Sequence, residues 1–226
     1  MEQIFLYHAL SSGVSGQITL PLQHVIEVQA PSAVPSSGGY SESRVEGFRY
    51  EDIISFSSAH TLTTGNETAN SYNTLATATI EGLNIHNVVV ADRVVARQAS
   101  RYSKDKKEQS TTIVGTHFEN LRVAGCSVKV EIDLKRVESS QRPERAEFGT
   151  FAAPLDLKDC RELELLEDGA IHIPQFGKVY LAEILVTPCY QSISMIRVVL
   201  GCAVEGQVTV AHASTNGEPM PGRGKP

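Results

Sequence analysis

The segment from Tyr72 to Arg101 constrains the fold more than any other part of the chain. Small and β-branched residues alternate from Ala76 to Ile80, which is the two-residue period of a strand. The run from Val88 to Arg97 is long enough for a helix, but it contains five valines. Because β-branched side chains favour extended backbone, we predict two strands separated by a turn or bulge at Gly82–Asn84.

The composition favours the same fold class along the whole chain. Tryptophan is absent, aromatic residues make up 6% and hydrophobic residues 41%, so Val, Ile, Leu and Ala must supply the core. A chain of 226 residues is long enough to bury a core without a metal or a disulfide. We predict a mostly β protein, an antiparallel β-sandwich with at most one short helix. A short β-solenoid-like stack is the alternative.

Charge and hydropathy limit the partners and the location that we expect. The net charge is −6, which disfavours nucleic acid as a partner because polyphosphate would be repelled. The sequence has no apolar run of about 20 residues and no basic and then apolar N-terminus, so we expect no transmembrane segment and no signal peptide. A cytoplasmic location is therefore the default prediction.

Four cysteines are spread along the chain without a C-x-x-C pair: Cys126, Cys160, Cys189 and Cys202. Their even number permits two disulfides, which only an oxidising compartment would form. We favour buried thiols, and the pairing stays open.

The chain divides by composition into three segments. Residues 1–44 hold one or more N-terminal strands and a Pro/Ser/Gly-rich loop, residues 45–213 form the main β domain with an insertion loop near 136–150, and residues 214–226 form a Gly/Pro-rich tail. From Gly217 onwards we expect neither helix nor sheet. The only plausible helix runs from Leu155 to Glu167, with a strand at Glu162 to Leu166 as the alternative.

A weak internal repeat could indicate a duplicated unit. The residues from Ile80 to Ile85 resemble those from Phe118 to Val123, and a valine-rich segment follows each copy. Because a solenoid needs three or more repeats, two copies favour a sandwich. If the repeat is structural, His86 and His117 could approach each other.

Several blocks carry a family resemblance. The segments Thr77 to Ile85, Val89 to Ala96, Gly115 to Val123 and Ile173 to Leu181 resemble the family called "choice-of-anchor P", over roughly residues 45–213. This resemblance implies a bacterial, β-rich domain of uncharacterised function, often exported and tethered to the cell surface. It supplies no catalytic residues, and it adds the cell surface or the extracellular space as a possible location.

Two groups of residues are candidates for chemistry. His117 and Glu119 lie two apart on one strand face, as a base with a carboxylate partner or half a metal site would. An exposed hydrogen-bonded pair is the more common meaning of such spacing. An acidic cluster could invite calcium, but it lacks the alternating ligands of a calcium loop; its members are Asp156, Asp159, Glu162, Glu164, Glu167 and Asp168. We therefore assign no catalytic, cofactor-binding or metal-binding residue.

These observations favour a non-enzymatic structural protein. We expect a homo-oligomer that self-associates through strand edges or terminal segments, because an apolar strand from Gln3 to Leu10 could complete another subunit's sheet. The alternative is a ligand- or carbohydrate-binding β-sandwich, although the chain has few aromatics for sugar stacking. A third hypothesis is a hydrolase or metal enzyme that uses His117 and Glu119.

Overall fold

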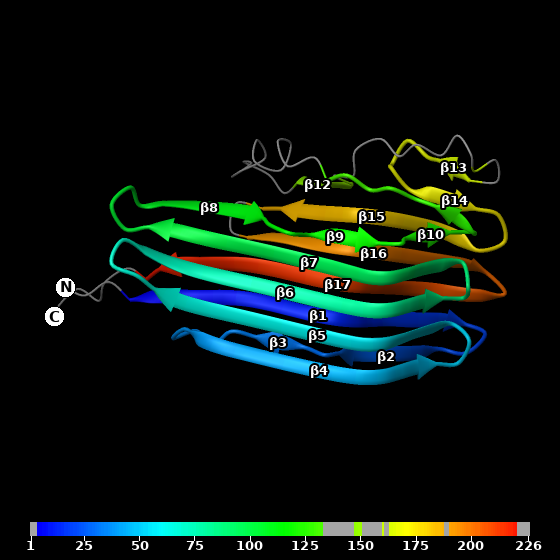
Figure 1. The fold of residues 1–226 in the computed structure, drawn as a ribbon, viewed down its shortest axis with the longest axis horizontal. Coiled ribbons are helices and arrows are strands. Elements are labelled where there is room, and N and C mark those ends of the chain that lie inside the picture. Colours follow the sequence, from blue (N-terminus) through cyan, green and yellow to red (C-terminus); the bar gives the residue numbers. More distant parts are fainter. Residues whose placement is uncertain (1–3, 133–146, 151–159, 161–162, 188–189, 221–226) are drawn as a thin grey trace.

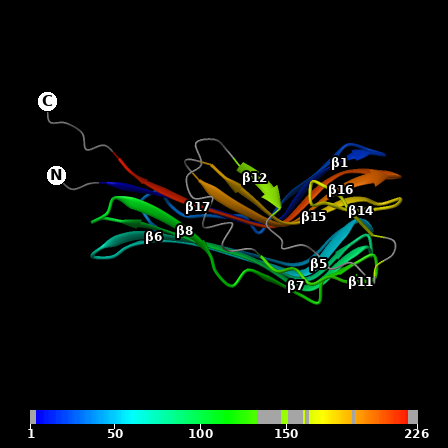
Figure 2. The ribbon, with the colours of Figure 1, turned by 90° about the horizontal axis from the view of Figure 1, so that it is seen from above.

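The computed structural model describes residues 4–132, 147–150, 160, 163–187 and 190–220, without the side chains of 147–150 and 202. Two antiparallel sheets, whose strands are labelled in Figure 1, pack face to face as two layers (Figure 2). The predicted sandwich is therefore confirmed, and the described residues contain no helix.

The first sheet, sheet A, has the strand order β13-β14-β15-β16-β17-β1-β2, with β12 paired to β15 and β3 paired to β1. Its strands are β1 (Phe5–Leu20), β2 (His24–Gln29), β3 (Ser32–Ala33), β12 (Glu147–Thr150), β13 (Glu164–Leu165), β14 (Ile171–Ile173), β15 (Gly177–Val186), β16 (Gln191–Cys202) and β17 (Val204–Pro219).

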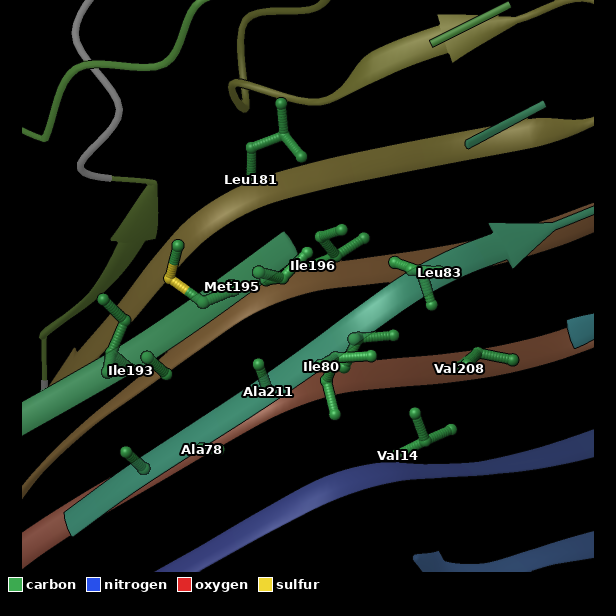
Figure 3. Packing of buried hydrophobic residues seen from close by; sticks show 14 of the residues in the cluster. Val14, Ala78, Ile80, Leu83, Leu181, Ile193, Met195, Ile196, Val208 and Ala211 are labelled. Atoms are coloured by element: carbon green, nitrogen blue, oxygen red, sulfur yellow. The ribbon is translucent and has the colours of Figure 1, made fainter. Parts of the chain in front are cut away.

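The second sheet, sheet B, has the order β11-β10-β7-β6-β5-β4, with β8 and β9 paired to β7. Its strands are β4 (Gly39–Tyr50), β5 (Ile54–Glu67), β6 (Ser71–Ile85), β7 (Val89–Ser103), β8 (Glu108–Ile113), β9 (His117–Glu119), β10 (Arg122–Val123) and β11 (Cys126–Ser127). The core lies between the sheets and consists mainly of aliphatic side chains such as Ile80, Leu83, Ile193 and Val208 (Figure 3).

A crease crosses both sheets at right angles to the strands. In sheet A the ladder skips one residue in each of four strands, namely Ala182, Met195, Ala211 and Gly13. In sheet B it skips Gly47, Ser57, Gly82 and Asp92. Positive φ angles occur at Ala182, Ala211, Gly47 and Gly82. Both sheets bend the same way at this level, so the outer face of sheet A is concave (Figure 2).

The terminal segments differ from the prediction. β1 pairs with β17 of the same chain from Phe5 opposite Pro219 to Leu20 opposite Glu205, so the N-terminal strand lies inside sheet A. The expectation that sheet structure stops before Gly217 is wrong, because β17 continues to Pro219. Phe5 and Tyr7 hold this end of the sandwich by packing with Tyr72.

The predictions for the middle of the chain need similar corrections. Most of the proposed insertion loop, residues 136–146, lies outside the described residues, but Glu147–Thr150 form β12. Residues 155–159 and 161–162 of the proposed helix also lie outside them. The described part, Leu163–Glu167, contains β13, in line with the strand alternative. The internal repeat is not structural, because one copy lies within β6 and the other spans β9 and β10.

Candidate functional site

The first candidate group of the sequence, His117 and Glu119, lies on the convex side, on β9 of sheet B. His117 Nε2 lies 3.1 Å from Glu119 Oε1, and both side chains are about half exposed. Arg93 lies 3.8 Å from Glu119. His86 lies in the turn after β6, next to Ile85, which pairs with Val89. His117 pairs with Val95, six residues further along β7. At the usual rise per residue, the two histidines are therefore about 20 Å apart along the strand. The predicted approach of the two histidines is therefore wrong.

The acidic cluster does not gather into one site in the described part of the chain. Asp156, Asp159 and Glu162 lie outside it. Glu164 contacts His172, and Asp168 accepts hydrogen bonds from the Ala170 amide and the Tyr180 hydroxyl. The Ala170 amide is the main cause that lowers the pKa of Asp168 below its usual value. No group of three or more metal-ligating side chains forms among the described residues.

Neither the cysteines nor a search for membrane-spanning helices points to a functional site in the described residues. Cys126 is half-buried and Cys160 is buried, while Cys189 and the Cys202 side chain lie outside the described part. None of the described residues belongs to a helix that could cross a bilayer.

A polar groove lies on the concave face of sheet A, where the crease bends the strands. Two rows of outward side chains lie on either side of the crease, and within each row the residues pair with one another across neighbouring strands. One row is Glu183, Ser194, His212 and Ser12, and the other is Tyr180, Arg197, Thr209 and Ser15. Together with Gln207 they form the floor of what we call the concave groove. Apart from Tyr180, these residues line a hollow of about 600 Å³.

A buried ion pair spans the crease in this groove. Arg197 Nε and Nη2 each donate a hydrogen bond of 2.7 Å to the carboxylate of Glu183. The Glu183 side chain is 3% exposed and that of Arg197 20% exposed. The guanidinium also lies 3.8 Å from the centre of the Tyr180 ring. Its hydrogen bonds to Glu183 raise the pKa of Arg197 further above its usual value, so the guanidinium stays charged beside the carboxylate.

His212 sits beside this pair, and its Nδ1 lies 2.9 Å from the Ser194 hydroxyl. Burial lowers the pKa of His212 below its usual value, because desolvation penalises the charged imidazolium. The ring is therefore neutral at pH 7, with one nitrogen to donate and one to accept. The groove floor thus presents neutral hydrogen-bonding groups beside an internally neutralised ion pair.

The lowered pKa of His212 predicts a pH dependence of stability. The unfolded chain binds a proton at His212 near pH 6.5, whereas the folded chain binds it only at lower pH. The stabilisation is therefore complete above about pH 6.5 and is lost as the pH falls towards the folded pKa. Thermal melting of the wild type and His212→Gln at pH 7.5 and pH 5 measures this difference. The wild type should lose more stability on acidification, and equal losses would contradict the prediction.

An apolar wall borders the floor along β2 and β3. Leu10, Val28, Pro31 and Ala33 line a second hollow of about 340 Å³, which shares Ser12 and His212 with the first. Val25 and Val28 line a third, which shares Ser15, Gln207 and Thr209 with the first. Leu10, Val25 and Val28 are each at least half exposed. The concave groove is therefore continuous and has a polar floor with one aliphatic side.

Sequence reasoning missed the groove because its residues are isolated polar positions, on three consecutive strands near the C-terminus and on β1 at the N-terminus. The available signal was the alternation of Ser and Thr with aliphatic residues in segments such as Ser192–Arg197 and Thr209–Ser214. Alternation marks a solvent-facing side, but it does not reveal which strands lie side by side.

The comparisons with known proteins give one match. A family model described as a domain of unknown function (DUF8256) matches residues 5–159, or 155 of the 226 residues. The matched range holds all of sheet B and strands β1–β3 and β12 of sheet A, and it ends before β13. No curated protein and no solved structure matches the chain.

Proposed function

We propose a structural, self-assembling role for this chain, which belongs to the DUF8256 family. Two subunits associate by pairing their β4 strands, the exposed edge of sheet B. The observation that carries the proposal is that β4 is 12 residues long and pairs only with β5 in the described part of the chain. Unpaired backbone groups along such an edge are a template for another strand.

The other three sheet edges contrast with β4. β8, β9 and β10 cover the free side of β7, β12 and β14 cover that of β15, and β2 and β3 cover that of β1. None of these covering strands is longer than six residues. Short edge strands are a common protection against edge-to-edge pairing. A long edge on one side only, in which the proposed pairing around Ser43 lies before the irregularity at Gly47, therefore favours directed pairing there. The N-terminal strand takes no part in this proposal, because it pairs within its own chain.

The charge pattern of β4 suits antiparallel pairing of two copies about a twofold axis. Glu42, Arg44 and Glu46 alternate along one face of the strand, and Arg44 contacts Glu46. Pairing centred on Ser43 places Glu42 opposite Arg44 of the partner subunit, twice by symmetry. Opposite charges at facing positions favour a cross-strand pair, and like charges disfavour it. The same charges can also protect a free edge, so association has to be measured.

Reversing one of these charges should weaken association. We expect Glu42→Arg to raise the dissociation constant about tenfold, because it places two positive charges opposite each other at two symmetric positions. The double variant Glu42→Arg with Arg44→Glu restores opposite charges and should recover association. Sedimentation velocity over a range of concentrations measures both, against a monomer mass of 24.5 kDa.

The matched control is Arg49→Glu, which changes an exposed charge on β4 that contacts Asp52 and lies outside the proposed pairing. Its association should equal that of the wild type. A wild type that remains monomeric at every concentration would contradict the proposal. So would a double variant that associates as weakly as Glu42→Arg, because the charge order would then play no part.

The remaining expectations from the sequence stay predictions. They are the absence of catalytic activity, the resemblance to the choice-of-anchor P family with its bacterial origin, and the choice between a cytoplasmic and a surface location. The ligand-binding alternative has a specific observation in its favour, the concave groove.

A further inference from the structure

We propose that the concave groove binds a neutral oligosaccharide, which lies along the crease and crosses β15, β16, β17 and β1. This inference is independent of the assembly proposal, because the groove lies on sheet A and β4 is an edge of sheet B. It rests on the free hydrogen-bonding groups of the floor, on the balance of charge, on the spacing of the two rows and on the aliphatic wall.

Four polar side chains of the floor are available to a ligand. Ser12, Ser15, Thr209 and Gln207 make no side-chain hydrogen bond within the described part of the chain, although all of them line the same hollow. His212 adds a neutral ring nitrogen beside them. The floor thus offers hydroxyl, amide and imidazole groups, each able to donate and accept, and sugar hydroxyls need partners of both kinds.

The charge balance selects a neutral ligand. On the described floor the charged side chains are Glu183 and Arg197, which are matched to each other at 2.7 Å. The third hollow adds the carboxylate of Glu27, which would repel an anion. Burying an ion pair such as Glu183 and Arg197 is costly and gives little net stability compared with apolar residues. Its place on β15 and β16, at one side of the hollow, therefore favours a role in shaping the surface. An anionic chain would also meet a protein of net charge −6.

The spacing of the rows distinguishes a sugar chain from a peptide. Side chains of one row repeat at the distance between strands, about 4.8 Å, which is close to the length of one pyranose residue. In an extended peptide, the side chains on one face repeat every second residue, at about 6.8 Å. This repeat does not match the spacing of the row. Four strands span about 14 Å, enough for three or four sugar units.

The wall supplies the apolar contacts that the carbon-bound faces of sugar rings require. Leu10, Val25 and Val28 are 56%, 59% and 50% exposed, so a ligand on the floor would cover them. Arg197 lies over the Tyr180 ring, and the described residues of the floor include no other aromatic side chain. We therefore expect weak affinity, with a dissociation constant on the order of 1 mM.

Amide chemical shifts of the ¹⁵N-labelled chain provide the test. The probes are cellohexaose and maltohexaose, compared with an anionic oligogalacturonate and a threonine-rich hexapeptide. We expect at least one neutral hexasaccharide to shift the amides of Ser12, Ser15, Ser194 and Thr209 saturably. The triple variant Ser12→Ala, Ser15→Ala and Thr209→Val removes three hydroxyls and should weaken binding at least about tenfold.

The matched control is Thr77→Val with Thr79→Val on the convex face, where neither side chain is part of the groove. Its affinity should equal that of the wild type. Three results would overturn the inference: no shift on the floor from either neutral sugar, tighter binding of the oligogalacturonate or the peptide, or unchanged affinity in the triple variant. Sedimentation of the same variants reports on assembly separately, so failure of one proposal is distinguishable from failure of the other.

Discussion

Replacing Glu183 with alanine should lower the free energy of unfolding by about 3 kcal/mol, because it leaves a charged group without its partner in a desolvated place. Arg197 donates two hydrogen bonds to Glu183 and keeps only 20% of its side chain exposed. That partial exposure places the expected loss at the low end of the range for buried pairs. Urea unfolding at pH 7.5 measures it.

The double variant Glu183→Leu with Arg197→Met distinguishes two effects on stability. One is the cost of leaving a single buried charge unpaired, and the other is the net contribution of the intact ion pair. It removes both charges while keeping most of the side-chain volume, so we expect it to be more stable than Glu183→Ala. A loss below about 0.5 kcal/mol in Glu183→Ala would show that water screens the pair like a surface salt bridge. The argument for an organised groove floor would then fail.

Replacing Gly82 with valine should cost about 3 kcal/mol, from backbone strain and crowding together. Gly82 has a φ of +62°, a conformation that β-branched residues rarely adopt. A Cβ atom there would lie 2.6 Å from Ser57 Oγ and 3.1 Å from Ser57 Cβ. Both residues belong to the crease of sheet B, so the substitution acts on the bend itself.

Gly201→Ala is the matched control for this substitution. Its added Cβ would meet only Gly177 Cα, at 3.9 Å, and Gly201 has no positive φ. We expect a change within about 0.5 kcal/mol. Urea unfolding compares the two, and equal stability of Gly82→Val and Gly201→Ala would mean that the crease does not depend on a left-handed residue in β6.

The sequence predicted the fold class because the spacing of hydrophobic residues and the content of β-branched residues can be read within each segment of the chain. The run from Val88 to Arg97 became most of β7, and the charged residues 104–107 became the turn that leads to β8. The tail was predicted wrongly because Gly217 and Pro219 disfavour strands in isolation. Pairing with Tyr7 and Phe5 outweighs that local preference.

The crease and the groove could not be predicted, for two physical reasons. Gly47 and Gly82 are residues that a bend often uses, but Ala182 and Ala211 adopt positive φ angles without any such signal. The groove also depends on strand order, which places Glu183, Ser194, His212 and Ser12 side by side. Neighbouring positions in the chain favour pairing of β15, β16 and β17, but they do not indicate that β1, far away in the chain, lies beside β17.

The pairing of β1 with β17 determines how the molecule responds to force. β1 begins and β17 ends at the same end of the sandwich, on neighbouring antiparallel strands (Figure 1). A pull applied between them loads the hydrogen bond from Met220 to Ile4 first and then opens the ladder one residue pair at a time. Resistance should be low in that direction. A load carried through one terminus and the β4 edge would instead act across many hydrogen bonds at once.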